Sequence, residues 1–152
     1  MSKSIVYHGN YIVAERPELV MCVYTKDFGT GFYCTSSREQ AELWAGRFEK
    51  GILNAYELSI DTRLSILEFT DMTEEWLDFI VDCRLGKKHN YDIVIGPVAN
   101  DPVYTYVTDY LECSLTREQF WVLAKFTDPT YQISFCSKDS LKCLKFAWSQ
   151  EV

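Results

Sequence analysis

Two aromatic side chains, Tyr33 and Trp44, are separated by eleven positions in a stretch that runs from a glycine-containing turn to a helix signal. Gly29 and Gly31 permit a backbone that bulkier residues disfavour, and the apolar run after them predicts a short, buried strand. A strand that leads directly into an amphipathic helix places Tyr33 at a strand end and Trp44 on the adjoining helix. The two rings are then expected to form two flat walls of one slot.

The helix that should carry Trp44 has a strong start signal. Two overlapping capping boxes precede it, because a serine is followed three residues later by Glu or Gln. The helix is expected to bury one face, since small and aromatic residues recur at helical spacing. The capping pairs are Ser36 with Glu39 and Ser37 with Gln40, and the recurring residues are Ala41, Trp44, Ala45 and Phe48.

Polar residues at strand ends supply the other candidates. Ser4–Gly9 reads as a first strand that ends in the pair His8-Gly9. Residues 91–97 read as a central strand, and Asp101 follows it within Asn100-Asp101-Pro102, a composition typical of a turn. A lone histidine or a turn aspartate is usually structural, so we regard these residues as functional candidates only in combination with Tyr33 and Trp44.

The segment Gly29–Thr35, together with Gln40–Ala45, resembles the central motif of ADP-ribosyltransferases of the diphtheria-toxin and poly(ADP-ribose) polymerase branch. In that branch two aromatics at this separation sandwich the nicotinamide of NAD. Tyr33 matches the first, and Trp44 stands where the second is usually tyrosine. The chain looks most like small bacterial, toxin-like relatives in this superfamily, some of them encoded beside an antitoxin. The resemblance extends loosely over residues 5–146.

The resemblance implies roles for individual residues. The His-Gly pair of relatives binds NAD, so Gly9 would hold the nicotinamide carboxamide through its backbone and His8 would hydrogen-bond a ribose hydroxyl. Active relatives carry a glutamate on a late strand, and that position falls on Gln132 here. Three alternatives remain open: a transferase that works without the carboxylate, a transferase that uses another acid such as Asp101, and an NAD-binding or interaction module with little catalysis. The ADP-ribose acceptor stays unspecified.

Composition favours one soluble domain over residues 1–152. About 47% of the 152 residues are hydrophobic, which argues against disorder, and no apolar run approaches the roughly 18 residues of a membrane span. Polar residues interrupt the amino-terminal segment, so it lacks the apolar core of a secretion signal and a cytoplasmic location is expected. The six cysteines show no close metal-ligand spacing, and buried free thiols are expected.

A net charge of −7 opposes general binding to nucleic-acid phosphates. Only a local basic patch would offset it, and residues 84–89 supply one in Arg84, Lys87, Lys88 and His89. We expect these to be solvated residues at a helix end.

Strands and short helices alternate without a regular βαβ rhythm, which predicts an α+β domain. That agrees with the split β-sheet core of ADP-ribosyltransferases. Strands are predicted over residues 4–9, 32–34, 54–60, 64–69, 91–97, 131–136 and 144–148, and helices over 36–48, about 74–85, 102–110, 116–126 and 137–142. Asp71 with Glu74 is the expected cap of the second helix and Gly86 its expected end, and Thr116 with Gln119 forms a capping box at the start of the fourth.

Overall fold

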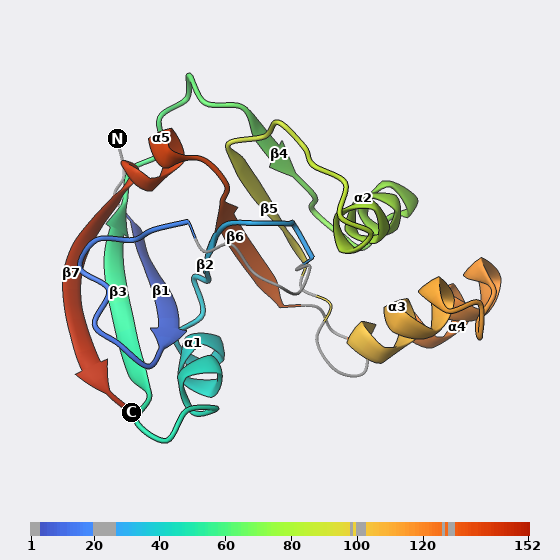
Figure 1. Cartoon of the computed structure of the whole chain (residues 1–152), viewed down its shortest axis with the longest axis horizontal. Coiled ribbons are helices and arrows are strands. Elements are labelled where there is room, and N and C mark those ends of the chain that lie inside the picture. The colour runs from blue at the N-terminus through green and yellow to red at the C-terminus, as the bar shows by residue number, and fades with distance from the viewer. Residues whose placement is uncertain (1–3, 20–26, 98, 100–102, 126, 128–129) are drawn as a thin grey trace.

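The computed structural model describes residues 4–19, 27–97, 99, 103–125, 127 and 130–152. Two β-sheets and their covering helices make up this part of the chain (Figure 1). The strands are β1 (Ser4–Asn10), β2 (Phe32–Cys34), β3 (Ile52–Leu58), β4 (Ile66–Glu68), β5 (Ile93–Pro97), β6 (Tyr131–Phe135) and β7 (Leu144–Glu151). The helices are α1 (Arg38–Ala45), α2 (Glu74–Arg84), α3 (Val103–Leu111), α4 (Arg117–Ala124) and α5 (Lys138–Leu141).

One sheet has the order β1-β3-β7 and is antiparallel throughout. The other has the order β2-β6-β5-β4, with antiparallel pairs except for the parallel pair β4 and β5. A bridge joins them where the Tyr7 and Thr35 backbones exchange two hydrogen bonds, of 2.8 and 2.9 Å. The α+β class predicted from the sequence is therefore confirmed. Assignment to the ADP-ribosyltransferase fold remains a prediction.

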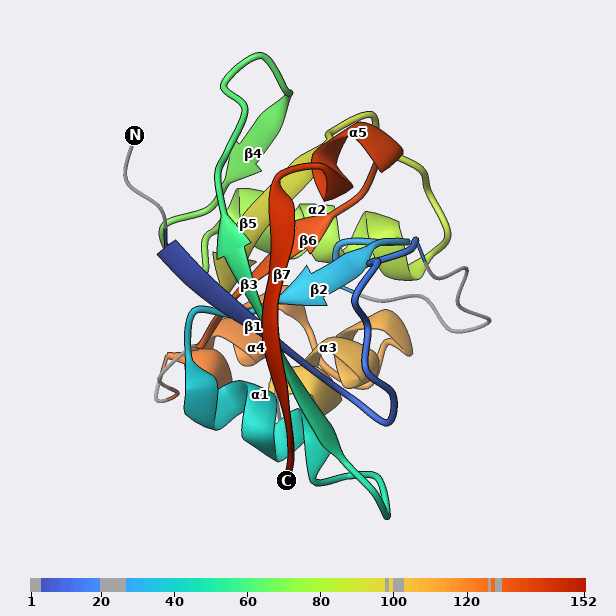
Figure 2. The same cartoon turned by 90° about the vertical axis from the view of Figure 1, so that its left-hand side faces the viewer.

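Two hydrophobic cores follow from the alternation of side chains along β2. Phe32 and Cys34 enter a core that lies between the two sheets, while Tyr33 enters a core on the opposite face of the four-stranded sheet. Helices α2, α3 and α4 cover that second face (Figure 1), and they contribute Trp76, Leu77, Ile80, Val103, Val107, Phe120 and Ala124 to its core. In Figure 2 the three-stranded sheet faces the viewer and these helices lie behind it.

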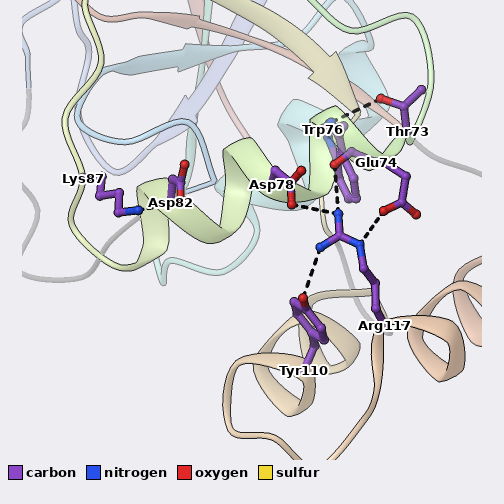
Figure 3. A network of polar contacts seen from close by, with 8 residues as sticks. All are labelled: Thr73, Glu74, Trp76, Asp78, Asp82, Lys87, Tyr110 and Arg117. Carbon is purple, nitrogen blue, oxygen red and sulfur yellow. Dashed lines mark hydrogen bonds and ion pairs between the residues drawn. The ribbon is translucent and has the colours of Figure 1, made fainter.

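Arg117 fixes the start of α4 against α2 (Figure 3). Its guanidinium donates to the Glu74 carboxylate, to Asp78 Oδ1 at 2.8 Å and to the Glu74 carbonyl oxygen at 3.2 Å. A further nitrogen donates to the hydroxyl of Tyr110 on α3, at 3.1 Å. Because one planar group serves three helices, the α3–α4 pair has a defined position on α2.

The helix caps agree with the sequence in three of five predictions, and the predicted pair Ser36 with Glu39 was wrong because Ser37 is the N-cap of α1. Ser37 caps α1 and accepts the Gln40 N–H, and Thr116 with Gln119 forms the capping box of α4. Gly86 has φ +87° just after α2, as expected of a residue that ends a helix. The predicted cap of α2 from Asp71 and Glu74 was wrong, since Thr73 accepts the Trp76 N–H instead.

Two further expectations need correction. Helix α1 stops at Ala45, so Phe48 lies beyond it with 41% of its surface exposed. Cys34, Cys83 and Cys143 are buried free thiols as expected, but Cys113 is exposed, and Cys22 lies outside the described residues. No described helix has the length and apolar character needed to cross a membrane.

The capping of α1 gives a matched test. Ser37→Ala should destabilise the protein by about 1 kcal/mol, because the Gln40 N–H loses its acceptor. Ser36→Ala is the control, since this neighbouring exposed serine precedes the cap and should shift stability by less than about 0.5 kcal/mol. Urea unfolding measures both, and an equal loss in the two variants would contradict the assignment of the cap.

Candidate functional site

The turn that leads into β2 is held from several directions. Gly29 has φ +80°, a conformation that favours glycine. The Phe28 N–H donates to the Tyr33 hydroxyl at 3.1 Å, and this hydroxyl donates in turn to the Gly29 carbonyl oxygen at 2.5 Å. The Phe28 carbonyl accepts from His89 Nε2 at 2.9 Å. His89 Nδ1 accepts the Tyr91 N–H, so Nε2 is the nitrogen that carries the hydrogen.

Tyr33 is a largely buried residue. Its exposed fraction is 7%, and its ring lies nearly parallel to that of Phe28, with centroids 6.5 Å apart and an interplanar angle of 16°. Burial raises the pKa of the Tyr33 hydroxyl far above its ordinary value, so the group stays protonated. The hydroxyl therefore serves the turn as a donor and an acceptor, a role that the sequence did not reveal.

His8 and Gly9 lie near the end of β1, but the strand continues one residue beyond the predicted pair, to Asn10, and the two residues face opposite sides of the sheet. His8 Nδ1 donates to the Tyr33 carbonyl oxygen at 2.6 Å, and its ring stacks on Phe32 with centroids 4.1 Å apart. Gly9 lies under α1, where an added Cβ would be 2.2 Å from the Ala41 carbonyl oxygen and 3.0 Å from Trp44 Cβ. Glycine is needed here because β1 and α1 approach each other closely.

Trp44 is half-buried on α1, beside Gly9. Helix α1 packs on β1 through its small buried residues Ala41 and Ala45. Trp44 therefore lies at the edge of this contact, next to the protein surface. This placement brings the second predicted aromatic next to the His8-Gly9 pair.

Gln132 lies on β6, and its exposed fraction is 5%. Within β6 it shares a face with Ser134, which pairs with Tyr33 of β2, so Gln132 and Tyr33 are on the same face of the sheet.

The bridge between Tyr7 and Thr35 makes this face continuous across both sheets. Tyr7 shares its face of β1 with Gly9, and Thr35 continues the face of Tyr33. Gly9, Trp44, Tyr33 and Gln132 thus come from four elements to one side of the joined sheets. The ring of His8 lies on the other side and reaches Tyr33 through a backbone carbonyl. Asp101 lies outside the described residues.

A buried ion pair beside the turn was missed in the sequence. The Arg84 side chain is 6% exposed and donates to Asp27 Oδ1 from Nη2 at 2.7 Å and from Nε at 3.1 Å. The expectation of a solvated basic cluster was therefore wrong for Arg84. Its partner is 57 positions away, so no local pattern signals the contact. Among the described residues, no group of three His, Cys, Asp or Glu side chains is placed to hold a metal ion.

The described part of the chain is thus an α+β protein whose two sheets are joined by one backbone bridge. Gly9, Trp44, Tyr33 and Gln132 lie on one side of the joined sheets, and the His8 ring lies on the other. The chain belongs to the DUF3990 family, a family of proteins of unknown function, whose model matches residues 4–146. Comparisons with curated proteins and with solved structures found no match.

The double role of the Tyr33 hydroxyl predicts a specific loss of stability. Tyr33→Phe keeps the ring but leaves the buried Phe28 N–H without its acceptor, so we expect a loss of about 1–3 kcal/mol. Tyr131→Phe is a matched control, because the exposed Tyr131 hydroxyl donates only to the Thr70 carbonyl and should cost about 1 kcal/mol or less. Denaturant unfolding compares them. Equal stability of Tyr33→Phe and the wild type would contradict the role of the hydroxyl in the turn.

Proposed function

We propose that this protein binds NAD and acts as an ADP-ribosyltransferase, cleaving the nicotinamide–ribose bond and transferring ADP-ribose to an acceptor. The observation that carries the proposal is the gathering of Gly9, Trp44, Tyr33 and Gln132 on one side of the joined sheets. Gly9 and Tyr33 match the motifs that suggested NAD in the sequence, whereas Trp44 and Gln132 stand where relatives carry tyrosine and glutamate. The sequence motifs did not require these four residues to share one side of the sheets.

The chemistry requires groups that bind a flat neutral ring and support positive charge on the ribose. Trp44, half-buried beside Gly9, offers an aromatic surface, and the Gly9 backbone offers hydrogen-bonding groups for a carboxamide. Tyr33 supports this side mainly from within the core, because little of its ring is exposed. The amide of Gln132 has both a donor and an acceptor for a ribose hydroxyl.

Gln132 brings no negative charge to the developing cation. Loss of one focused electrostatic contact costs roughly 3–4 kcal/mol in a transition state, or two to three orders of magnitude in rate. The proposal therefore includes either a slow transferase or a second acid, for which Asp101 is the candidate.

The neutral side chain at position 132 favours a second candidate function, an NAD-binding or protein-interaction module of the same fold. Such a module would use the same slot without cleaving the nucleotide. We further propose a cytoplasmic toxin restrained by an antitoxin protein, on the basis of the resemblance to toxin-like bacterial relatives. The acceptor would be a protein side chain, a nucleic acid, a small molecule or water.

Gln132→Glu tests catalysis. A carboxylate about 4 Å from the cation would be worth up to about 4 kcal/mol at an effective dielectric near 20, before desolvation is subtracted. We expect nicotinamide release, measured by mass spectrometry after incubation with NAD, to rise at least about tenfold. If Asp101 already serves as the acid, Asp101→Asn should abolish release and Gln132→Glu should add little. Binding of NAD without release in the wild type and both variants would overturn the transferase and leave the binding module.

Trp44→Ala tests the aromatic wall. Loss of the ring should weaken NAD binding by about 1 kcal/mol beyond simple burial, as measured by calorimetric titration. Trp148→Ala is the matched control, because Trp148 is also a half-buried tryptophan but packs under Arg38, with the guanidinium carbon 5.1 Å from the ring centroid. Equal NAD affinity of a folded Trp44→Ala variant and the wild type would contradict the slot.

A further inference from the structure

We propose that the buried ion pair of Asp27 and Arg84 positions the turn on which Tyr33 depends, and thereby sets the geometry of the nucleotide site. The part of this inference that concerns NAD rests on the proposed function. The part that concerns the turn rests on contacts in the structure alone.

The Asp27 carboxylate joins three segments of the chain. Oδ1 accepts both hydrogen bonds from Arg84 at the end of α2, and Oδ2 accepts the Ala99 N–H, just after β5, at 2.9 Å. The Arg84 guanidinium also lies over the Tyr104 ring of α3, 4.3 Å from its centroid. Asp27 is therefore fixed relative to α2, α3 and the end of β5.

Asp27 is the residue directly before Phe28, and Phe28 and Gly29 are the residues whose backbone groups bond the Tyr33 hydroxyl. The position of the Asp27 carboxylate therefore constrains the neighbouring Phe28, and through Phe28 it constrains the ring and hydroxyl of Tyr33. His89 holds the same turn through a hydrogen bond to the Phe28 carbonyl. The turn consequently has a side-chain anchor at each of its first two residues.

Stability alone does not account for an ion pair in this place. The two side chains are 6% and 10% exposed, and a well-packed apolar pair of similar volume often serves a protein equally well or better. An apolar pair makes no directional hydrogen bonds, whereas this carboxylate is held by two guanidinium nitrogens and a backbone N–H. These directional hydrogen bonds support a positioning role for the ion pair rather than a role in packing alone.

The test is the double variant Asp27→Asn with Arg84→Met. Asn keeps an oxygen for the Ala99 N–H, and removal of both charges leaves neither one buried without its partner. Amide hydrogen exchange at Phe28 reports on the turn, since this N–H bonds the Tyr33 hydroxyl, and the amides of β3 serve as an internal reference. We expect Phe28 exchange to be about tenfold faster while β3 is unchanged. The Kd for NAD should rise about tenfold.

Asp61→Asn with Arg63→Met is the matched control. It removes an exposed Arg–Asp pair between β3 and β4 that makes no hydrogen bond to the described residues of the turn. Both measurements should stay at wild-type values in this control. If the double variant at 27 and 84 does not fold, Arg84→Lys, which keeps the charge but loses the forked geometry, is measured in the same way and the same direction is expected.

Wild-type exchange at Phe28 in the folded variant would overturn the inference, and so would faster exchange with an unchanged Kd. If wild-type protein binds no NAD, the proposed function fails. The exchange result then decides by itself whether the pair positions the turn.

Discussion

The two hydrogen bonds between the backbones of Tyr7 and Thr35 decide how the rest of the molecule is arranged. They join a three-stranded and a four-stranded sheet, so side-chain alternation continues from one sheet into the other. Which of the two cores a strand residue near the bridge enters then follows from its odd or even position along the strand. Phe32 and Tyr33, neighbours in the chain, enter different cores, and Gly9 and Gln132, far apart in the chain, come to the same side.

Burial has consequences for the polar groups of both sheets and of the helices that cover them. Burial raises the pKa of the Cys83 thiol to about 12 and that of Cys34 well above its ordinary value, so both remain protonated and unreactive at neutral pH. In the three-stranded sheet, a buried polar side chain on β3 instead holds a backbone segment. The fully buried Asn54 accepts the Ala14 N–H at 2.9 Å and donates to the Ile12 carbonyl oxygen at 3.1 Å, which fixes the segment that follows β1.

Local signals predicted the parts of the fold that depend on local chemistry. The Ser37 cap, the Thr116–Gln119 capping box and the strand at Phe32–Cys34 were all evident, because each rests on residues within four positions. Contacts between distant residues were not evident. Arg84 was assigned to solvent since its partner Asp27 lies 57 positions earlier, and Phe48 was placed on α1 because helical spacing does not show where a helix stops. The same contrast applies to the candidate site. Sequence motifs suggested its residues, but only the structure shows which of them share a face.

Helices α3 and α4 are inserted between β5 and β6, and Pro97 and Tyr131 form the pair next to the insertion. Closure of a long connection carries an entropic cost that grows with its length, and this cost opposes the pairing of the two strands. This entropic cost is lowered because α3 and α4 pack on each other and because Arg117 anchors both helices to the preceding α2. Formation of the helical pair before β5 and β6 join would shorten the effective loop and so lower the entropic cost of adding the strand that bears Gln132 to its sheet.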